Sequence, residues 1–444
     1  LLSLYAPITS SAAELYSALA VGDGKSQDVK LKNKKVVTVT QGNYRSLIAS
    51  SDNATDRKKI FEAVFKTFDE HKTTYATIYN NVLQTNKATS KARNYDSVLE
   101  SYLYNDNIPT KVFTNLIEVA GKYNKSLKKY IRLRKKYLGL KQYHTYDRFL
   151  ELAHSNKEYT YEEAKELFFH SISQFPQDFQ DKAHEVLRDG FVDVMEKVGK
   201  RTGAYSSSVA NLHPFILLNF DHTLDSVFTV AHEAGHSIHS MYATQTQPTM
   251  LQDYTIFVAE IASTFNEHTL LDYFLSLPDA TKEEKIMVIQ KAIDEIMSTF
   301  YRQTLFAEYE YLANHEVAKG NPINHQVLSQ IMIDLYKKYY GLDITKEEVK
   351  QYVWAYIPHL FYTPFYVYQY ATSFAASFKI YKDVKEKVPG AFDRYINLLK
   401  SGGSKYPVDQ AKEAGVDFTK KDAYMAVVER MDNLVEELEK LLNA

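Results

Sequence analysis

A mainly helical protein with a small β element near the middle of the chain is the fold class that the sequence predicts. Apolar residues recur at spacings of three and four in several long segments, as they do on the buried face of a helix. Glycine and proline are scarce, at 15 and 11 of 444 residues, which leaves little turn chemistry for an all-β protein. No linker rich in Pro, Gly or Ser divides the chain. We therefore expect one unit over residues 1–444, with approximate lobes over 1–150 and 151–444.

The helical patterns are clearest in three segments. Apolar residues stand at positions 61, 64, 65 and 68 in the first, and residues 422–442 carry a longer apolar stripe with Glu and Lys between its members. The third segment, residues 125–136, is strongly basic. Because apolar residues interleave its Lys and Arg side chains, we interpret it as the solvated face of a helix rather than a patch for nucleic acid or lipid.

Strand signals are few. Residues 29–40 alternate around Asn33 and Lys34, which predicts a small hairpin. Residues 206–220 form the second candidate and end in the apolar run 215–218, so they account for the β element near the middle of the chain. Ser401-Gly-Gly-Ser404 is the clearest loop.

Composition excludes several classes of partner and chemistry. The net charge is −2, which gives no general attraction to nucleic acid or to acidic membranes. The chain has no cysteine, so it has no disulfide, thiolate metal ligand or cysteine nucleophile; this fits a reducing cytosol, and we expect a cytoplasmic protein. No apolar run reaches the roughly 18 residues of a membrane span, so neither nucleic acid nor membrane is an expected partner. The oligomeric state is not determined by the sequence.

The most informative stretch, residues 229–240, contains the pattern His-Glu-x-x-His. Residues four apart lie on one face of a helix, so His232 and His236 can present two imidazole nitrogens to one zinc ion at about 2.0–2.1 Å. Glu233 follows the first histidine directly, and its carboxylate can reach a zinc-bound water without being a ligand. The pattern therefore predicts two zinc ligands and a general base.

The residues around this motif are apolar, so its helix is expected to be buried. Unpaired buried polar groups are costly, and the plainer alternative is that these three residues are hydrogen-bonded members of the core. Gly235 in the helix interior costs about 1 kcal/mol relative to Ala, which close approach of a second helix would explain. His239 would lie about 10 Å along the axis from His232, too far for one zinc ion, so it is expected to be a neighbour of the site.

A third ligand must come from elsewhere in the chain. The metzincin pattern requires a glycine and then a histidine at positions that hold His239 and Tyr242 here, so that interpretation fails. Glu260 is the better candidate, because a lone carboxylate in its apolar segment would be costly unless it bound a divalent cation; a buried ion pair is the alternative. Glu267, seven residues further on the same helical face, could orient a ligand histidine or could be a surface charge.

Four tyrosines lie within nine residues near the C-terminal end of the chain: Tyr362, Tyr366, Tyr368 and Tyr370. If this segment is helical, the first, second and fourth share a face at a spacing of four. Together with His359, their hydroxyls could donate hydrogen bonds to the charge that develops in a tetrahedral intermediate. The alternative is an aromatic stripe packed in the core.

Beyond these motifs, the sequence resembles the oligoendopeptidase F family, within the thimet oligopeptidase group of metallopeptidases. The resemblance extends over nearly the whole chain, and the helix with His232 and His236 is its specific part, together with the segment around Glu260. Its shorter pieces are residues 95–100, 107–109, 134–139, 203–205, 213–219, 257–264, 358–359, 365–370 and 401–404.

This resemblance implies an ellipsoidal, two-lobed helical protein with a deep central channel and one zinc ion at its floor. It also implies cleavage of short, unstructured peptides. Position by position, the metal ligands would be His232, His236 and Glu260, and Glu233 would be the general base.

The same resemblance implies roles for residues outside the metal site. His359, Tyr366 and Tyr370 would stabilise the oxyanion. Substrate contacts would come from Gly203, Ala204, Tyr205, Tyr362 and Tyr368, the first three by offering backbone to the substrate as an added strand. Members of the family usually carry an additional N-terminal helical segment, which we expect this chain to lack.

The predicted function is thus that of a zinc-dependent endopeptidase acting on internal bonds of short oligopeptides. Glu233 would activate the zinc-bound water and pass its proton to the leaving amine. A dipeptidyl carboxypeptidase with the same zinc site is the alternative among enzymes, and it would need a cation placed for the C-terminal carboxylate of the substrate. A catalytically inactive peptide-binding protein is the alternative from another class.

Overall fold

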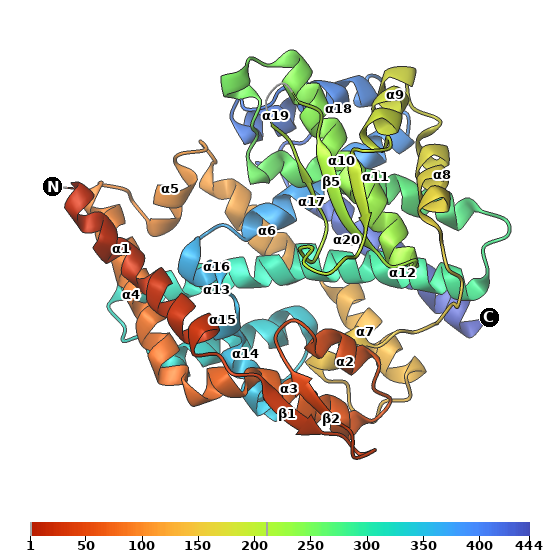
Figure 1. Cartoon of the computed structure of the whole chain (residues 1–444). Helices are drawn as coiled ribbons and strands as arrows, with labels where there is room; N and C mark the ends of the chain where they lie inside the picture. Colours follow the sequence, from red (N-terminus) through yellow and green to blue (C-terminus); the bar gives the residue numbers. More distant parts are fainter. Residues whose placement is uncertain (1, 210–211) are drawn as a thin grey trace. The chain divides into compact units, whose positions relative to one another are not determined.

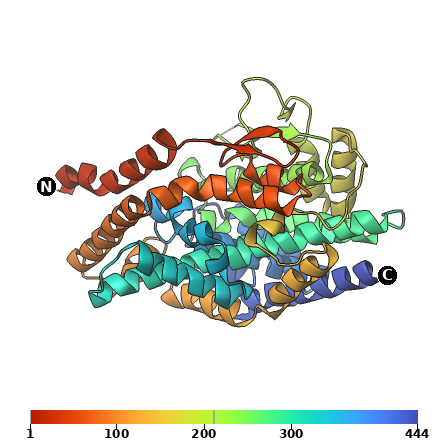
Figure 2. The same ribbon diagram turned by 90° about the horizontal axis from the view of Figure 1, so that it is seen from below.

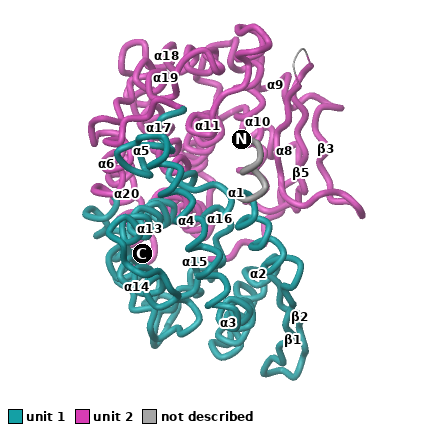
Figure 3. The backbone as a smooth tube through the Cα atoms, turned by 90° about the vertical axis from the view of Figure 1, so that its left-hand side faces the viewer, with its two compact units in different colours: residues 1–105, 120–152, 301–368 teal, residues 106–119, 153–300, 369–444 magenta. Residues whose placement is uncertain are grey.

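The computed structural model describes residues 2–209 and 212–444, with side chains described from residue 10 onward, and it divides into two compact units (Figures 1 and 3). Unit 1 consists of residues 1–105, 120–152 and 301–368, and unit 2 of residues 106–119, 153–300 and 369–444. Helices dominate both units and strands are few, so the predicted fold class is confirmed. Within the described ranges, no helix combines the length and the apolar character needed to cross a membrane.

The elements of unit 1 are helices, short helical turns and one strand pair. The α-helices are α1 (Leu2–Ser17), α2 (Tyr44–Ala49), α3 (Ala54–Glu70), α4 (Lys72–Ala92), α5 (Val98–Leu103), α7 (Lys125–Tyr137), α13 (Arg302–Lys319), α14 (His325–Tyr340), α15 (Val353–Tyr356) and α16 (His359–Tyr362). The short turns are η1 (Ala18–Gly22), η2 (Thr145–Phe149), η5 (Ile344–Lys346) and η6 (Glu348–Tyr352). Strands β1 (Gln27–Lys30) and β2 (Val36–Val39) pair in antiparallel fashion.

The hairpin of β1 and β2 lies beside α3, as Figures 1 and 2 show. Its turn places Lys34 in the left-handed region, with φ of +68°. Both carboxylate oxygens of Asp56 accept the backbone N–H of Lys32, at 3.0 and 3.1 Å, and this joins the hairpin to the helix. Asn53 directly precedes helix α3, and its side chain caps the first turn. The predicted hairpin and the predicted helix over residues 61–68 are both confirmed.

Helix α7 carries the basic run, and its apolar residues are buried, as the sequence predicts. One basic residue departs from the solvated face: Arg134 is fully buried. Its guanidinium donates to the hydroxyl of Tyr130 and to the carbonyl of Asp147, each at 3.0 Å. Arg134 therefore ties α7 to the following turn of unit 1 and does not belong to a surface patch.

The elements of unit 2 surround a small sheet and the helix that carries the metal motif. The helices are α8 (Tyr161–Ile172), α9 (Gln177–Val186), α10 (Leu224–Thr246), α11 (Ile256–Ser276), α12 (Lys282–Glu295), α18 (Ala391–Lys400), α19 (Pro407–Glu413) and α20 (Asp422–Asn443), with the turn η3 (Thr249–Leu251). Three elements cross the boundary between the units: α6 (Thr110–Lys122), η4 (Ile296–Tyr301) and α17 (Tyr368–Lys385).

The sheet of unit 2 contains β3 (Val192–Met195), β4 (Tyr205–Ser207) and β5 (Phe215–Phe220), in the order β3-β5-β4. β3 runs parallel to β5, whereas β4 is antiparallel to it and forms an edge of the sheet. The predicted strand region 206–220 therefore contains most of β4 and all of β5, and residues 210–211 within it lie outside the described residues. Both β4 and β5 pack against α10, which places an edge strand next to the helix of the metal motif. Figure 1 shows β5 beside α10.

The two units differ from the predicted lobes of 1–150 and 151–444. The chain changes unit after residue 152, close to the expected boundary, but residues 106–119 already belong to unit 2, and residues 301–368 return to unit 1. They return because α13 packs against α4 and α14. The periodicity of apolar residues within a segment does not indicate which distant segment it contacts, so the sequence did not predict this packing.

Candidate metal centre

Helix α10 presents the two histidines of the motif. Its first turn is capped by Thr223, whose side chain accepts the N–H of Ser226. Apolar and small side chains bury most of the helix. His232 and His236 lie one turn apart, remain partly exposed, and place their Nε2 atoms 3.2 Å from each other. Both imidazoles therefore point to one position.

Helix α11 brings Glu260 to the same position. It crosses α10 at Gly235, where an added Cβ would lie 2.6 Å from the carbonyl oxygen of Ala262. Such a contact is closer than a real Cβ tolerates, so only glycine permits this approach. Asn266 secures the crossing, since its Nδ2 donates to the carbonyl of Ala231 at 3.0 Å. The close helix approach expected from Gly235 is confirmed.

The three predicted ligand atoms form a nearly equilateral triangle. Glu260 Oε2 lies 3.5 Å from His232 Nε2 and 3.4 Å from His236 Nε2, and the two nitrogens are 3.2 Å apart. A tetrahedral ion with bonds of about 2.0–2.1 Å holds its ligands about 3.3–3.4 Å apart. The donor set and its spacing therefore fit a zinc ion, and among the described residues this is the group of three that can hold a metal.

The charges in this group favour a bound cation. Burial alone would raise the pKa of Glu260, but His236, His232 and the Ser263 hydroxyl lower it to about 2. The hydroxyl of Ser263 donates to Glu260 Oε2 at 3.0 Å. Burial lowers the pKa of His232, whereas the neighbouring carboxylates, Glu267 foremost, raise it to about 9. Glu260 is therefore ionised, and positive charge is stabilised between the ligands.

Glu267 occupies the place predicted for a carboxylate that orients His232. Its Oε2 lies 3.5 Å from Nδ1 of that histidine. Burial raises the pKa of Glu295 well above its usual range, so this residue at the end of α12 stays protonated and hydrogen-bonds to Glu267. Lys291, ion-paired with Asp225, adds positive charge nearby. A carboxylate at Nδ1 keeps the proton there and leaves Nε2 for a metal. Glu295 and Lys291 belong to no recognised motif, so the sequence did not identify them as parts of the site.

Glu233 lies beside the ligand triangle and is 5% exposed. Its Oε2 has no hydrogen-bond partner in the part of the chain that the structure describes. Burial raises its pKa, and the two motif histidines oppose this rise. The backbone amide of Ser206, in β4, lowers the pKa of this carboxylate slightly, and the Ser206 hydroxyl lies 2.8 Å from that of Ser237. A buried carboxylate with one oxygen available is suited to accept a proton.

His239 lies outside the ligand triangle. Its ring stacks on Tyr254 at 3.6 Å between centroids and 8° between planes. Burial lowers its pKa to about 3, so the imidazole is neutral. The structure thus places His239 as a packed neighbour of the site, in the position expected from the sequence.

The glycines of the loop at residues 401–404 support the segment that leads into α11. A Cβ on Gly402, whose φ is +49°, would lie 2.2 Å from the carbonyl oxygen of Leu251. A Cβ on Gly403 would lie 2.5 Å from that of Asp253, and the Gly403 N–H donates to Leu251 at 2.8 Å. The sequence marked this stretch as a loop, but its supporting contact with residues 251–253 appears only in the structure.

The predicted substrate-binding stretch, Gly203, Ala204 and Tyr205, leads into the edge strand β4. Gly203 has φ of +86°, and its carbonyl accepts Asn219 Nδ2 at 2.7 Å, which holds the stretch against β5. Among the described strands, none pairs with the outer edge of β4. An extended peptide can add to such an edge through main-chain hydrogen bonds.

His359 and Tyr366 lie together within unit 1. Their ring centroids are 5.9 Å apart and their planes differ by 8°. Burial and the nearby Arg302 guanidinium lower the pKa of His359 below its usual value. The imidazole is therefore neutral near pH 7 and carries its proton on one of its two nitrogens.

The segment of Tyr362, Tyr366 and Tyr370 is not one helix, so the condition under which these tyrosines would share a face is not met. Helix α16 ends before Tyr366 and α17 begins after it, so the three tyrosines do not lie on one helix. Pro364 lacks an N–H and disfavours helical geometry in the residue before it. Phe365 then adopts a positive φ of +55°, which completes the break.

The remaining tyrosines have distinct surroundings. Tyr362 is exposed and its ring meets that of Tyr16 edge-on, at 5.4 Å between centroids. Tyr368 is 1% exposed, so it offers no surface to a substrate in this conformation, contrary to the contact predicted for it. Tyr370 is half-buried and belongs to unit 2.

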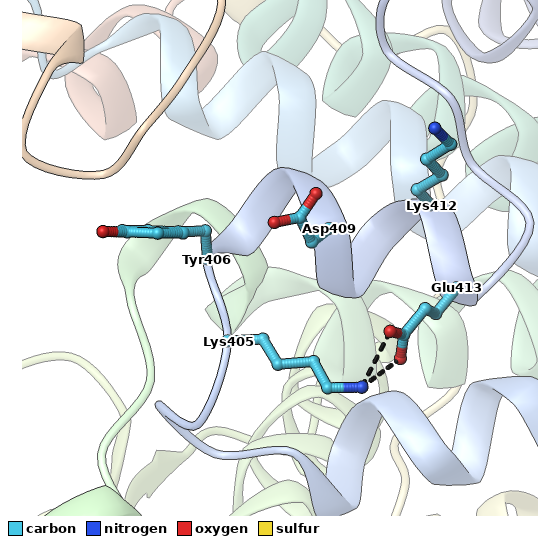
Figure 4. A pocket seen from close by; sticks show the side chains of 5 residues that line it. All are labelled: Lys405, Tyr406, Asp409, Lys412 and Glu413. Atoms are coloured by element: carbon cyan, nitrogen blue, oxygen red, sulfur yellow. Dashed lines mark hydrogen bonds and ion pairs between the residues drawn. The ribbon is translucent and has the colours of Figure 1, made fainter.

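A surface hollow of about 500 Å³ lies along α19 in unit 2 and does not have the features of a reaction site (Figure 4). Lys405 Nζ lies 2.7 Å from both carboxylate oxygens of Glu413, so these charges neutralise each other. Tyr406, Asp409 and Lys412 complete its lining. It is open to solvent and holds no buried polar group.

A mainly helical protein that sets two histidines and a glutamate around one metal position, with a buried glutamate beside them, has the site of a metallopeptidase. Comparison with known proteins places the chain within this class. Residues 47–429 match the model of peptidase family M3, and the chain belongs to that family.

Several relatives and solved structures that are similar to the chain are named as oligopeptidases or peptidases. Oligopeptidase PepF of Bacillus subtilis is 34% identical over 443 residues, and an oligoendopeptidase F homolog of Lactococcus lactis is 33% identical over 442. Among solved structures, a peptidase from Chlamydophila abortus has a TM-score of 0.90 at 34% identity. Oligoendopeptidase F from Enterococcus faecium has a TM-score of 0.82 at 27% identity.

The matches cover this chain almost completely but only part of each relative. They span 100% of the chain, 66% of the Bacillus protein and 73% of the Lactococcus protein. Both structural matches cover 99% of the chain and 73% of the solved chain. The chain thus spans about two thirds to three quarters of the length of these relatives.

Proposed function

We propose that the chain is a zinc-dependent endopeptidase that hydrolyses internal bonds of short, unstructured peptides. The observation that carries this proposal is the ligand triangle of His232, His236 and Glu260 with Glu233 buried beside it. The names of the relatives, which include oligoendopeptidases, support the reaction and the substrate class. The cytoplasmic location expected from the sequence remains part of the proposal.

Each residue of the centre has a defined task in this reaction. Zinc, when bound, supplies Lewis-acid chemistry that makes a water more acidic and polarises the scissile carbonyl. Glu267 holds the proton on His232 Nδ1, so that Nε2 remains a ligand atom. Glu233 accepts the proton of the attacking water and transfers it to the leaving amine. Its burial raises its pKa, which strengthens it as a base.

Two further parts of the chain would act on the peptide. The outer edge of β4 would pair with the extended substrate, and the contact of Ser206 with Ser237 of α10 would hold that edge beside the base. Tyr366 and Tyr370, with the N–H of His359, would donate to the oxyanion. The stacked pair of His359 and Tyr366 supports this role, because each ring restricts the other.

Cleavage of an internally quenched peptide blocked at both ends tests the proposal. We expect the zinc-loaded wild type to cleave it and Glu233→Gln to lose at least about 100-fold in kcat, since general-base catalysis contributes about 10²–10⁴-fold. Glu437→Gln, at an exposed site on α20, is the matched control and should cleave as the wild type does.

The outcomes separate the candidate functions. Cleavage only of peptides with a free C-terminus, two residues from that end, would replace the endopeptidase by a dipeptidyl carboxypeptidase. Binding without cleavage in the wild type would identify a peptide-binding protein. Equal turnover by wild type and Glu233→Gln would remove Glu233 from the mechanism.

A further inference from the structure

The break between α16 and α17, in unit 1, contains a strained residue, Phe365. Its φ of +55° lies in the left-handed region, which is unfavourable for a residue with a Cβ. Because it lies after the end of α16 and before the start of α17, its backbone N–H has no partner within a helix. A residue keeps such a conformation only where its surroundings hold it there.

Glu310 of α13 supplies part of that support. Its Oε1 accepts the backbone N–H of Phe365 at 2.8 Å. The ring of Phe365 meets that of Tyr102, in α5, with 5.5 Å between centroids and 37° between planes. Glu310 and Phe365 are only 1% and 3% exposed. Two elements of the same unit therefore fix Phe365, one through its backbone and one through its ring.

Glu310 has no ionic partner that would explain its burial. Among the described residues it forms no ion pair, and its Oε2 has no hydrogen-bond partner. Burial raises its pKa to about 8, and the N–H of Phe365 opposes the rise. The titratable groups beside it are three tyrosines, Tyr79 of α4, Tyr102 of α5 and Tyr309 of α13. The acid is therefore neutral near pH 7, and Phe365 is the residue that its side chain hydrogen-bonds.

The helix of His359 is anchored separately. Phe361, on the same helix α16, stacks on Tyr16 of α1 at 4.0 Å between centroids and 21° between planes. The ring of Tyr79, in α4, lies 5.3 Å from that of Phe361. These contacts fix α16 within unit 1. The position of Tyr366 relative to His359 then depends on the break that joins them.

Tyr366 follows Phe365 directly in the chain, and its ring lies parallel to that of His359. We propose that Glu310 is a positioning residue, whose hydrogen bond to Phe365 fixes the break and so holds Tyr366 against His359. This inference rests on the proposed function, which gives Tyr366 and His359 the oxyanion as their ligand. Because Glu310 is buried, it contacts no peptide itself and acts through Tyr366.

Replacement of Glu310 by Met removes the acceptor and keeps a side chain of similar length. On an internally quenched peptide at pH 7, we expect Glu310→Met to lose about 10–100-fold in kcat, because a small misplacement of a catalytic group has an effect of this size. KM should stay unchanged, since Glu310 does not touch the peptide. Glu310→Gln should keep the wild-type kcat, because its amide oxygen still accepts the N–H of Phe365 and the acid that it replaces is neutral.

A double-mutant cycle shows whether Glu310 acts through Tyr366. Tyr366→Phe removes the hydroxyl and should lose about 100–1,000-fold in kcat, as expected for one oxyanion donor. Once this hydroxyl is absent, Glu310→Met should cause little further loss, so the double variant should resemble Tyr366→Phe. A double variant whose loss equals the product of the two single losses would contradict the proposal.

A stability control separates positioning from general damage to unit 1. Leu127→Ala removes a fully buried side chain from α7 and leaves the break untouched, so it should unfold more easily and keep the wild-type kcat. An equal loss of kcat in Leu127→Ala and Glu310→Met would contradict the proposal. If Glu310→Met does not fold, Glu310→Asp replaces it, because the shorter acid withdraws the acceptor from Phe365. Full wild-type kcat in the variant used would likewise exclude a positioning role.

The failure of this inference differs from the failure of the proposed function. If the wild type cleaves the peptide and Glu310→Met cleaves it equally fast, the positioning role is contradicted while the peptidase function stands. If Tyr366→Phe keeps the wild-type kcat, Tyr366 is not an oxyanion donor and the positioning role fails with it. If the zinc-loaded wild type does not cleave, the proposed function itself fails.

Discussion

Gly235 determines how closely α10 and α11 approach, and so whether His232, His236 and Glu260 meet at one position. The glycine has no Cβ at a point where the backbone of α11 would lie 2.6 Å away. The geometry of the ligand triangle thus depends on a residue that touches no metal.

Substitution of Gly235 by Ala should therefore separate the helices. We expect Gly235→Ala to lower the free energy of unfolding by about 1–3 kcal/mol, the usual cost of overpacking. We also expect weaker zinc binding, because Glu260 moves away from the histidines. Denaturant unfolding and zinc titration measure the two effects. Gly42→Ala is the control, since its Cβ would meet only an ordinary contact at 3.7 Å. Unchanged zinc affinity in Gly235→Ala would contradict this account of the crossing.

Glu310 is a buried acid that holds the break between α16 and α17. It accepts the N–H of Phe365 at 2.8 Å, and its Oε2 has no partner among the described residues. Burial raises its pKa to about 8, although that hydrogen bond opposes the rise. The folded protein therefore holds a proton that the unfolded chain releases near pH 4.3.

The raised pKa of Glu310 makes the free energy of unfolding depend on pH in a defined direction. The contribution of Glu310 to the free energy of unfolding is fully present below about pH 4.3 and is lost as the pH rises through about 8. Relative to Glu310→Gln, the wild type should lose about 1 kcal/mol of unfolding free energy per pH unit in this window. Unfolding at pH 5 to 8 measures the difference, and Glu437→Gln should follow the wild type. Equal slopes in wild type and Glu310→Gln would refute the assignment.

At the level of elements, the sequence predicts α10 and α11 well because their function constrains their residues. Polar groups in an apolar helix require partners, and His232, His236 and Glu260 are such groups. The tyrosine segment was predicted less well. Spacing alone favoured a helix, whereas the backbone of Pro364 and Phe365 breaks it.

Glu295 and Lys291 show why other parts of the site could not be predicted. Both lie on α12, in a segment without a recognised motif, and each is an ordinary charged residue there. Their influence on Glu267 comes from the tertiary structure, which brings α12 to that carboxylate.

At the level of the whole molecule, the two units hold different parts of the proposed machinery. Unit 2 contains the ligand triangle, Glu233 and the edge strand β4, whereas unit 1 contains His359 and Tyr366. The sequence predicted a helical protein and a boundary near residue 150, but it did not predict the return of residues 301–368 to unit 1. That return follows from packing of α13 on α4 and α14.

The central claim is that His232, His236 and Glu260 together bind one zinc ion. The most direct measurement is the zinc affinity of wild type and Glu260→Ala, by titration against a chelator of known affinity, with Glu437→Gln as the control. We predict one zinc per wild-type chain and a loss of more than about 100-fold in affinity for Glu260→Ala, beyond the 10–100-fold typical of residues that only orient a ligand. Equal zinc affinity of Glu260→Ala and wild type would contradict the claim.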